Sequence, residues 1–124
     1  IIIGADTIVV KDGEILGKPS SQEEAKAMLR SLSGRQHAVL TGVAIKRGPK
    51  EVVFHVTTRV IFRRLMEEEI QGYVASGEPL DKAGAYGIQG IGALWVEGIE
   101  GSYTNVVGLP VERVYEELKK FLSD

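Results

Sequence analysis

The sequence predicts one α/β domain with a sheet that is at least partly antiparallel. Two long strand-like segments, residues 37–47 and 51–62, are separated only by the turn Gly48-Pro49-Lys50, which joins antiparallel neighbours. Helical periodicity occurs before and after this pair, so helices should flank the sheet. A chain of 124 residues with 44% hydrophobic content is long enough for one core. We therefore expect residues 1–124 to form a single domain.

The N-terminal segment predicts a strand, a tight turn and a helix. Residues 1–10 are almost all apolar, which is typical of a strand buried on both faces. Asp12-Gly13 between two apolar pairs is a strong signal for a β-hairpin. A helix then runs to about Leu32, and Ser21 with Glu24 at its start fits a capping box.

The second half of the chain predicts two further helices and one more strand. A short helix over residues 67–76 begins with acidic side chains, where the helix dipole favours them, and Gly77 ends it. A strand is expected over residues 93–99, with Trp95 in the core. A helical turn near residues 103–107 precedes a last amphipathic helix, which begins near Pro110 and ends near residue 122.

Composition excludes several classes of function. The net charge of −2 gives no field that would draw the chain to nucleic acid or an anionic membrane, and no apolar run approaches the ~20 residues of a membrane span. The absence of cysteine excludes disulfides, thiolate zinc sites and a cysteine nucleophile, and fits a reducing compartment such as the cytoplasm. Because the chain starts with Ile1 in mid-strand, we expect that something precedes it in the natural protein.

Asp6 is the first candidate for chemistry. Its carboxylate interrupts the apolar segment, although aspartate is rare inside strands and a buried charge is costly unless it is paired. One interpretation is structural, with Asp6 at a strand end accepting a bond from a neighbouring backbone amide. The other is functional, with Asp6 as a general base or a metal ligand. Thr7 beside it is either a β-branched strand residue or a hydroxyl that faces a ligand.

Lys18 follows the predicted hairpin in the stretch Gly-Lys-Pro. The hairpin returns the chain past the first strand, which would bring Lys18 toward Asp6; the alternative is a solvated lysine in a turn. The pattern GxxxxGK(S/T) is absent, so Lys18 is not a P-loop lysine. His37 and His55 lack metal-ligand spacing and have apolar strand neighbours, so we interpret both as structural.

The glycine-rich stretch of residues 77–92 holds the remaining candidates. Its glycines let backbone approach a ligand and offer amides to phosphate oxygens, and Lys82 adds a positive charge. Asp81 and Glu78 are hard oxygen ligands of the kind that magnesium uses beside substrate phosphates. Gln89 carries a side-chain amide that can pair with a base edge. The alternative is an irregular surface loop with turn glycines.

Several ordered motifs together resemble the Maf family of nucleoside triphosphate pyrophosphatases, nearly from end to end of the chain. They are GADTIVV, GKP, LSGR-H-VLTGVAI, TTRV-F, EEI-YV-SGEPLDKAGAYGIQG-GA and EGIEGSY-NVVGLP. The resemblance implies an α/β fold with a twisted, mixed central sheet, flanking helices and a cleft between two lobes. It also implies cleavage of a nucleoside triphosphate to the monophosphate and pyrophosphate with a divalent cation, Mg or Mn. Family members are commonly homodimers, and some are linked to septum formation and division arrest.

The resemblance also assigns roles to single residues. The family's proton acceptor falls on Asp6, and its specificity-linked threonine and glutamine fall on Thr7 and Gln89. The Asp-Thr and Ile-Gln-Gly combination resembles the subgroup that acts on dTTP and UTP. Lys18 and Lys82 match basic positions that we assign to the phosphates.

The sequence departs from the family at its start. The Ser-x-Ser-Pro-Arg-Arg loop, which helps bind the triphosphate, is absent, and the chain begins where the family's second major strand begins. We therefore expect a chain truncated at its N-terminus, and a non-catalytic nucleotide-binding regulator of cell division is the alternative function. A purely structural dimer module is a third interpretation, which the cluster of Asp6, Lys82 and Gln89 disfavours.

Overall fold

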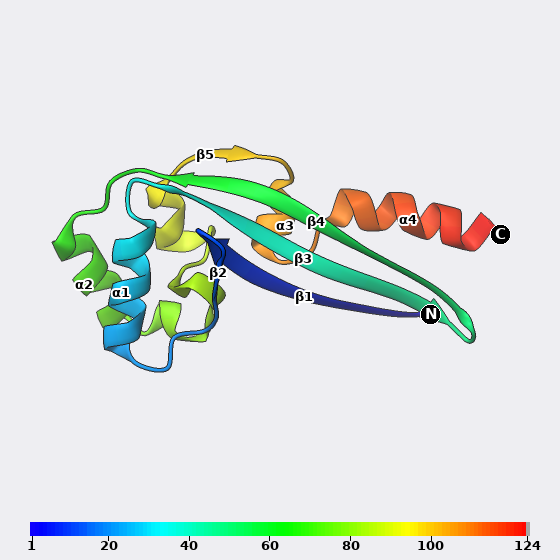
Figure 1. The fold of residues 1–124 in the computed structure, drawn as a ribbon, viewed down its shortest axis with the longest axis horizontal. Coiled ribbons are helices and arrows are strands. Elements are labelled where there is room, and N and C mark those ends of the chain that lie inside the picture. The colour runs from blue at the N-terminus through cyan, green and yellow to red at the C-terminus, as the bar shows by residue number, and fades with distance from the viewer. Residues whose placement is uncertain (124) are drawn as a thin grey trace.

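A five-stranded sheet runs through the computed structural model, which describes residues 1–123 (Figure 1). The strands lie in the order β2-β1-β3-β4-β5, and every pair in this sheet is antiparallel. The strands are β1 (Ile2–Lys11), β2 (Glu14–Leu16), β3 (Gln36–Arg47), β4 (Lys50–Phe62) and β5 (Val96–Glu100). The helices are α1 (Gln22–Leu32), α2 (Glu67–Ala75), α3 (Tyr103–Val107) and α4 (Val111–Ser123), with 3-10 turns η1 (Glu78–Asp81), η2 (Ala83–Ala85) and η3 (Gly90–Trp95). The predicted α/β class is confirmed.

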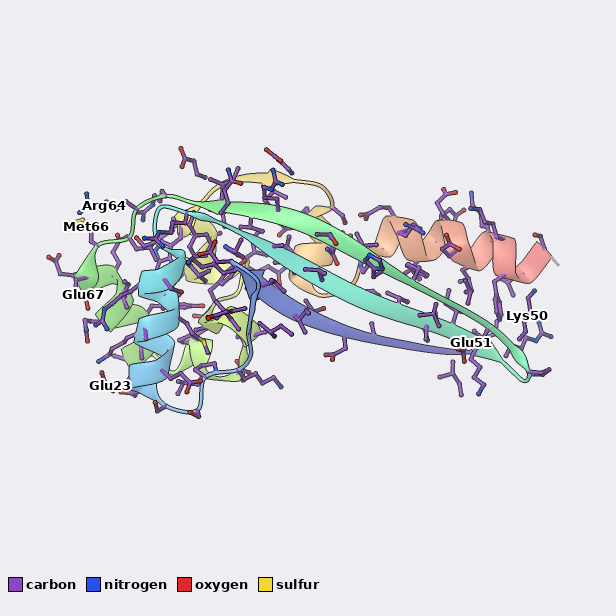
Figure 2. The ribbon with its side chains drawn as sticks, viewed as in Figure 1. Glu23, Lys50, Glu51, Arg64, Met66 and Glu67 are labelled. Carbon is purple, nitrogen blue, oxygen red and sulfur yellow. The ribbon has the colours of Figure 1, made fainter. Side chains whose placement is uncertain are left out.

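The strands β3 and β4 form the long axis of the molecule. They pair without interruption from Gln36 opposite Ile61 to Arg47 opposite Lys50. Figure 1 shows α1, α2 and the 3-10 turns gathered at one end of this pair, and α4 lying toward the other end, near the hairpin tip. Figure 2 shows the same separation, with Glu23 and Glu67 at the first end and Lys50 and Glu51 at the hairpin tip. The molecule therefore has two ends that share one pair of strands.

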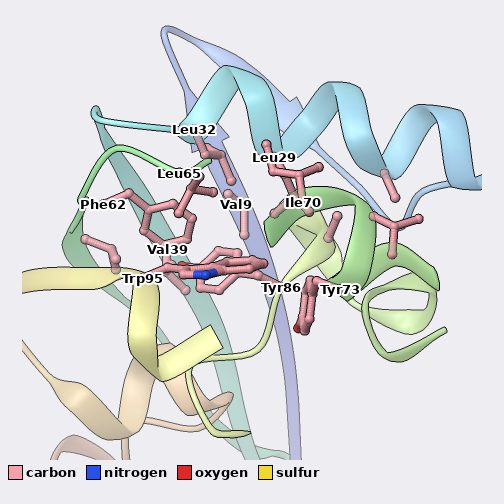
Figure 3. Packing of buried hydrophobic residues seen from close by; sticks show 14 residues of the cluster. Val9, Leu29, Leu32, Val39, Phe62, Leu65, Ile70, Tyr73, Tyr86 and Trp95 are labelled. Carbon is pink, nitrogen blue, oxygen red and sulfur yellow. The ribbon is translucent and has the colours of Figure 1, made fainter. Parts of the chain in front are cut away.

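The larger apolar cluster fills the first end of the molecule. Figure 3 shows Trp95 and Tyr86 between the sheet residues and the helices α1 and α2. Trp95 is 1% exposed and meets the Tyr73 ring edge-on, with centroids 4.6 Å apart. Trp95 thus lies in the core, as the sequence predicts. Other members of the cluster are Val9, Leu29, Leu32, Val39, Phe62, Leu65 and Ile70.

A second apolar cluster lies under α4. Val114 and Phe121 of the helix pack with Val43 and Ile45 of β3. Apolar positions three, four and seven residues apart give α4 one apolar stripe, which covers only one face of the strands. The far face of this part of the sheet stays exposed, for example at Val53, which is 66% exposed.

A buried polar band separates the two clusters. Thr41 of β3, Thr58 of β4 and Asn105 of α3 are each 0% exposed. The Asn105 side-chain amide donates to the carbonyl of Val39 at 3.1 Å and to the Thr58 hydroxyl at 2.9 Å. A buried amide that lacked these acceptors would cost about 1–3 kcal/mol, so the band fixes α3 to both strands.

Local signals at the N-terminal end of the chain are confirmed. Asp12 and Gly13 both adopt positive φ, at 50° and 80°, as a two-residue hairpin turn between β1 and β2 requires. The Ser21 hydroxyl caps α1 by accepting the Glu24 amide proton at 3.1 Å. The Glu24 carboxylate bonds to Ser20 rather than to the Ser21 backbone, so the capping box is shifted by one residue.

Two expectations about the strands are wrong. The first strand is not buried on both faces: residues 2–6 of β1 are exposed, because β2 pairs only with Val9–Lys11 and leaves the outer edge of β1 open before that point. The strand expected over residues 93–99 begins only at Val96. Residues 90–95 form η3 instead, because Gly90 has a φ of 72° and turns the chain.

An ion pair joins the two helices at the first end. The Arg30 Nε atom of α1 donates to the Glu67 carboxylate of α2 at 3.1 Å, and this bond lowers the pKa of Glu67 to about 2. Both side chains are about half exposed, so the pair contributes little to stability.

In the described part of the chain, no helix is both long and apolar enough to cross a membrane.

His37 of β3 is a buried titratable group that packs against the larger cluster. It is 4% exposed, its Nε2 atom lies 2.6 Å from the Tyr86 hydroxyl, and its ring meets Phe62 edge-on. Burial lowers the pKa of His37 to about 4, because the charged imidazolium would lose its water. The structural role predicted for His37 is confirmed.

We expect the free energy of unfolding to fall by about 2 kcal/mol when the pH is lowered from about 7.5 to about 5. Below pH 6.5 the unfolded chain takes up a proton at His37, whereas the folded chain resists it until about pH 4. The stabilisation is therefore complete above pH 6.5 and is lost as the pH falls toward 4. Urea unfolding of the wild type and of His37→Gln measures this difference.

The variant His37→Gln cannot titrate at this position and should lose most of that pH dependence. His55→Gln, a substitution on the exposed face of β4, is the matched control and should retain the wild-type dependence. Equal pH dependence in the wild type and in His37→Gln would contradict the prediction.

Candidate functional site

The candidate site is a cavity of about 530 Å³ at the middle of the sheet. Its walls are the edge of β1, the glycine-rich segment around η1 and η2, and the connection between α3 and α4. The volume lies in the range of small-molecule sites, about 300–1,000 Å³. The sequence-predicted residues on its wall are Asp6, Thr7, Lys18, Glu78, Lys82 and Gln89.

β1 presents two consecutive residues to this cavity. Asp6 lies opposite Gly42 and Thr7 lies opposite Thr41, so the two side chains stand on opposite faces of the sheet. Both can line one cavity because the described residues leave the outer edge of β1 unpaired before Val9, and the cavity extends around that edge. Asp6 is therefore exposed in mid-strand, and neither the buried position nor the strand-end position expected from the sequence is correct.

The Asp6 carboxylate is available for chemistry. No side chain within residues 1–123 forms a hydrogen bond or an ion pair with it. The Thr7 hydroxyl, in contrast, is engaged: it lies 2.9 Å from the Thr41 hydroxyl and donates to the Gly108 carbonyl at 3.2 Å. The bond to Gly108 fixes the wall formed by the α3–α4 connection to β1, and the bond to Thr41 joins β1 to β3.

Lys18 reaches the cavity from the segment after β2. The carbonyl of Gly17 accepts the amide proton of Gly84 at 3.1 Å, which ties this segment to the glycine-rich wall. The ideal position for a Cβ on Gly84 would be 3.1 Å from the Val9 side chain, so the wall lies directly against β1. Lys18 and Asp6 thus line the same cavity, although they are far from each other along the hairpin.

Lys82 is held at the mouth of the cavity by its neighbours. Its ammonium donates to the Asp81 carboxylate at 3.1 Å and to the Glu78 carbonyl at 3.1 Å. An ammonium has three protons, so one remains for a ligand in the cavity. The bond from Lys82, together with its charge, lowers the pKa of Asp81.

The two predicted metal ligands differ in position. Glu78 lines the cavity with Asp6, whereas Asp81 is not on the cavity wall, and its side chain is 81% exposed beside Lys82. In the described part of the chain, no three His, Cys, Asp or Glu side chains gather as a metal-binding group. Two carboxylates on one wall do fit magnesium, which is usually held by one or two carboxylates together with substrate phosphates.

Gln89 lies on the cavity wall immediately before η3. A side-chain amide there offers both a donor and an acceptor to a ligand. The backbone around it is held from the core, because the Tyr73 hydroxyl accepts the amide proton of Gly87 at 3.2 Å. Tyr73 itself is 2% exposed against Trp95, so the loop is fixed by a core side chain.

Sequence reasoning missed part of the wall. Tyr86 and the segment Val106–Gly108 line the cavity, and neither was assigned a role. Burial raises the pKa of Tyr86, whose hydroxyl bonds to His37. Tyr86 lies inside the glycine-rich motif, which was a usable signal. Gly108 meets Thr7 across 101 residues of chain, and no local pattern predicts such a contact.

We expect Gly92→Ala to disrupt this loop. A Cβ on Gly92 would lie 1.8 Å from the Gly87 carbonyl oxygen, a distance that forces the backbone to move. Faster amide hydrogen exchange over residues 82–92, with a smaller change over β3 and β4, would confirm the expectation. Gly72→Ala in α2 is the matched control, because nothing lies within 4 Å of its Cβ position and helix propensity improves there. An amide hydrogen exchange rate over residues 82–92 that is the same in Gly92→Ala as in the wild type would contradict the expectation.

Comparison with known proteins finds relatives along the whole chain. The family model described as Maf-like protein matches residues 1–121 of the chain. A protein of Bacillus mycoides (strain KBAB4) named dTTP/UTP pyrophosphatase is 59% identical over 124 residues, which are 100% of this chain and 65% of that protein. Proteins of the same name from Bacillus cereus (strain B4264) and Bacillus anthracis (strain CDC 684 / NRRL 3495) are 58% and 57% identical, with the same coverage.

The extent of the likeness settles the family. The chain spans about 65% of the length of these relatives, and all of its residues take part. The family model covers both ends of the molecule, including both apolar clusters and every wall of the cavity. The chain therefore belongs to the Maf-like protein family.

Proposed function

We propose that the protein to which this chain belongs hydrolyses dTTP and UTP to the monophosphate and pyrophosphate. The proposal rests on one observation: the Asp6 carboxylate, which has no side-chain partner among residues 1–123, lines one cavity of nucleotide size together with Lys18 and Lys82. The names of the relatives point to the same reaction and the same two substrates.

The proposed reaction is an attack of water on the α-phosphorus. Asp6 takes a proton from the water while the water oxygen forms a bond to the α-phosphorus. The bond between the α-phosphorus and the bridging α–β oxygen breaks. Pyrophosphate leaves with the electron pair of that bond. Lys18 and Lys82 offset the negative charge that builds on the phosphate oxygens, and the glycine-rich wall offers backbone amides to them.

A divalent cation, magnesium or manganese, belongs to the proposal. Glu78 and Asp6 are the wall residues that would hold it, and when bound it would supply positive charge to the phosphates and lower the barrier to deprotonating water. Asp81 would act on Lys82 and not on the cation, since its carboxylate lies off the wall.

Gln89 and Thr7 would recognise the nucleotide base through hydrogen bonds. Both line the cavity and both carry polar atoms that a base edge can pair with. A nucleotide base that left such a group unpaired would lose about 1–3 kcal/mol of binding free energy per group, enough to separate uracil and thymine from purines.

We also propose, on the family resemblance alone, a homodimer in the cytoplasm and a link to septum formation.

Asp6→Asn should lower pyrophosphate release at least about a hundredfold, because removing a general base typically costs that much or more. The assay measures pyrophosphate release from dTTP, UTP, CTP, GTP and ATP with magnesium. Asp12→Asn is the matched control: Asp12 lies in the exposed hairpin turn with a φ of 50°, which asparagine also tolerates.

The outcomes separate the candidate functions. Release from dTTP and UTP that is lost in Asp6→Asn and kept in Asp12→Asn supports the pyrophosphatase. If Asp6→Asn released pyrophosphate at the rate of the wild type, Asp6 would not be the general base. Nucleotide binding without pyrophosphate release, also in a chain of the relatives' full length, would favour a nucleotide-binding regulator of cell division.

Gln89→Ala should relax the preference for pyrimidines. The ratio of kcat/KM for UTP to that for GTP should fall about fivefold or more, the equivalent of one lost hydrogen bond. Gln71→Ala, at an exposed position of α2, is the matched control. An unchanged ratio in Gln89→Ala would show that this side chain does not contact the base.

A further inference from the structure

Two charged side chains of the cavity wall lie against glycines of the same wall. The Lys82 side chain covers Gly87, where a Cβ would come within 2.9 Å of Lys82 Cε and 3.1 Å of Lys82 Cδ. The Glu78 carboxylate lies near Gly90, where a Cβ would come within 3.2 Å of Glu78 Oε1. All four residues line the cavity. These two glycines therefore make room for charged side chains of the wall.

The Gly87 backbone is held from the side of the core. The Tyr73 hydroxyl accepts its amide proton at 3.2 Å, and Tyr73 is 2% exposed and meets the Trp95 ring edge-on. Gly92 lies so close that a Cβ there would be 1.8 Å from the Gly87 carbonyl oxygen. The Lys82 side chain thus packs against a piece of backbone that is fixed on its other sides.

This contact positions the Lys82 ammonium. The Lys82 side chain is 36% exposed, and a flexible four-carbon stem at such an exposure keeps one position only where packing holds it. With its stem against Gly87, the ammonium donates to the Glu78 carbonyl and to the Asp81 carboxylate, each at 3.1 Å. One proton remains for a ligand in the cavity.

We propose that Gly87 is a positioning residue for Lys82: the missing side chain at this position lets the lysine stem lie against the backbone, which keeps the ammonium where it can bind a phosphate group. The inference rests on the proposed function, because it takes Lys82 as a phosphate ligand.

The geometry of Gly87 makes the proposal testable by one methyl group. Gly87 does not have a positive φ, unlike Gly84 and Gly90 on either side, so alanine does not meet the strain of the left-handed region there. In Gly87→Ala the atoms that must give way belong to the far end of the Lys82 side chain and not to the backbone. The fold should therefore be kept while the ammonium is displaced.

Equilibrium binding of a UTP analogue, with an NH group in place of the α–β bridging oxygen, tests the proposal without turnover. With magnesium present, Gly87→Ala should bind the analogue about tenfold or more weakly than the wild type, because a charge-assisted bond to a phosphate is lost. Lys82→Met keeps an unbranched stem without the charge and should weaken binding by a similar factor. In the Lys82→Met background, Gly87→Ala should have little further effect, since no ammonium is left to displace.

Gly72→Ala is the matched control, because nothing lies within 4 Å of its Cβ position, and it should bind the analogue as the wild type does. Thermal unfolding checks that the fold is kept. A melting temperature of Gly87→Ala close to that of the wild type is expected. A variant that no longer folds would show that the backbone yields rather than Lys82, and would overturn the proposal.

The inference and the proposed function fail in different ways. Wild-type affinity in Gly87→Ala, or a loss of affinity that is equally large in the Lys82→Met background, overturns the role of Gly87 and leaves the pyrophosphatase standing. Wild-type affinity in Lys82→Met removes Lys82 from the phosphate site and, with it, this inference. A wild type that does not bind the analogue contradicts the proposed function as well.

Discussion

The uninterrupted pairing of β3 with β4 is the constraint on which the rest of the structure depends. Its register places Val43 opposite Phe54 and His37 opposite Val60, so one face of the same two strands serves both apolar clusters. A slip of one residue between the two strands would turn the side chains of one strand to the other face. The separate register of β1 on β3 places Thr7 opposite Thr41. Core and cavity are thus set by two registers that share β3.

The cavity lies where the apolar rows of the sheet are interrupted. Thr41, Thr58 and Asn105 form a buried band at that level, and a band of polar groups contributes less to stability than apolar side chains of equal volume would. The Asn105 side-chain nitrogen bonds to strand carbonyls and to Thr58, whereas the buried Asn105 Oδ1 atom has no hydrogen-bond partner among residues 1–123, which adds to the cost of the band. In return it fixes the α3–α4 connection and orients Thr7. The position of Thr7 on the cavity wall therefore depends on a part of the core that contributes less to stability than the apolar clusters.

The sequence predicted what short-range chemistry determines. Asp12-Gly13 and Ser21 are confirmed because turns and caps depend on neighbours in the chain. The exposure of Asp6 was not predictable, because it depends on how far β2 extends along β1. Residues 93–95 failed as a strand because Gly90 adopts a positive φ and the chain continues as η3, a backbone conformation that hydrophobicity does not reveal. Six predicted site residues do meet in one cavity, while the wall at Gly108 comes from a distant part of the chain.

The connection between α3 and α4 also has a mechanical consequence. Val106 packs on the larger cluster and Leu109 on the smaller one, so a few residues carry the chain from one cluster to the other along the cavity wall. Beyond that crossing, α4 depends on a small cluster and on one face of two strands. Such a region opens more easily than the rest of a domain. A molecule bound in the cavity would contact Val106, Val107 and Gly108 of this crossing and would therefore couple the unfolding of the two ends.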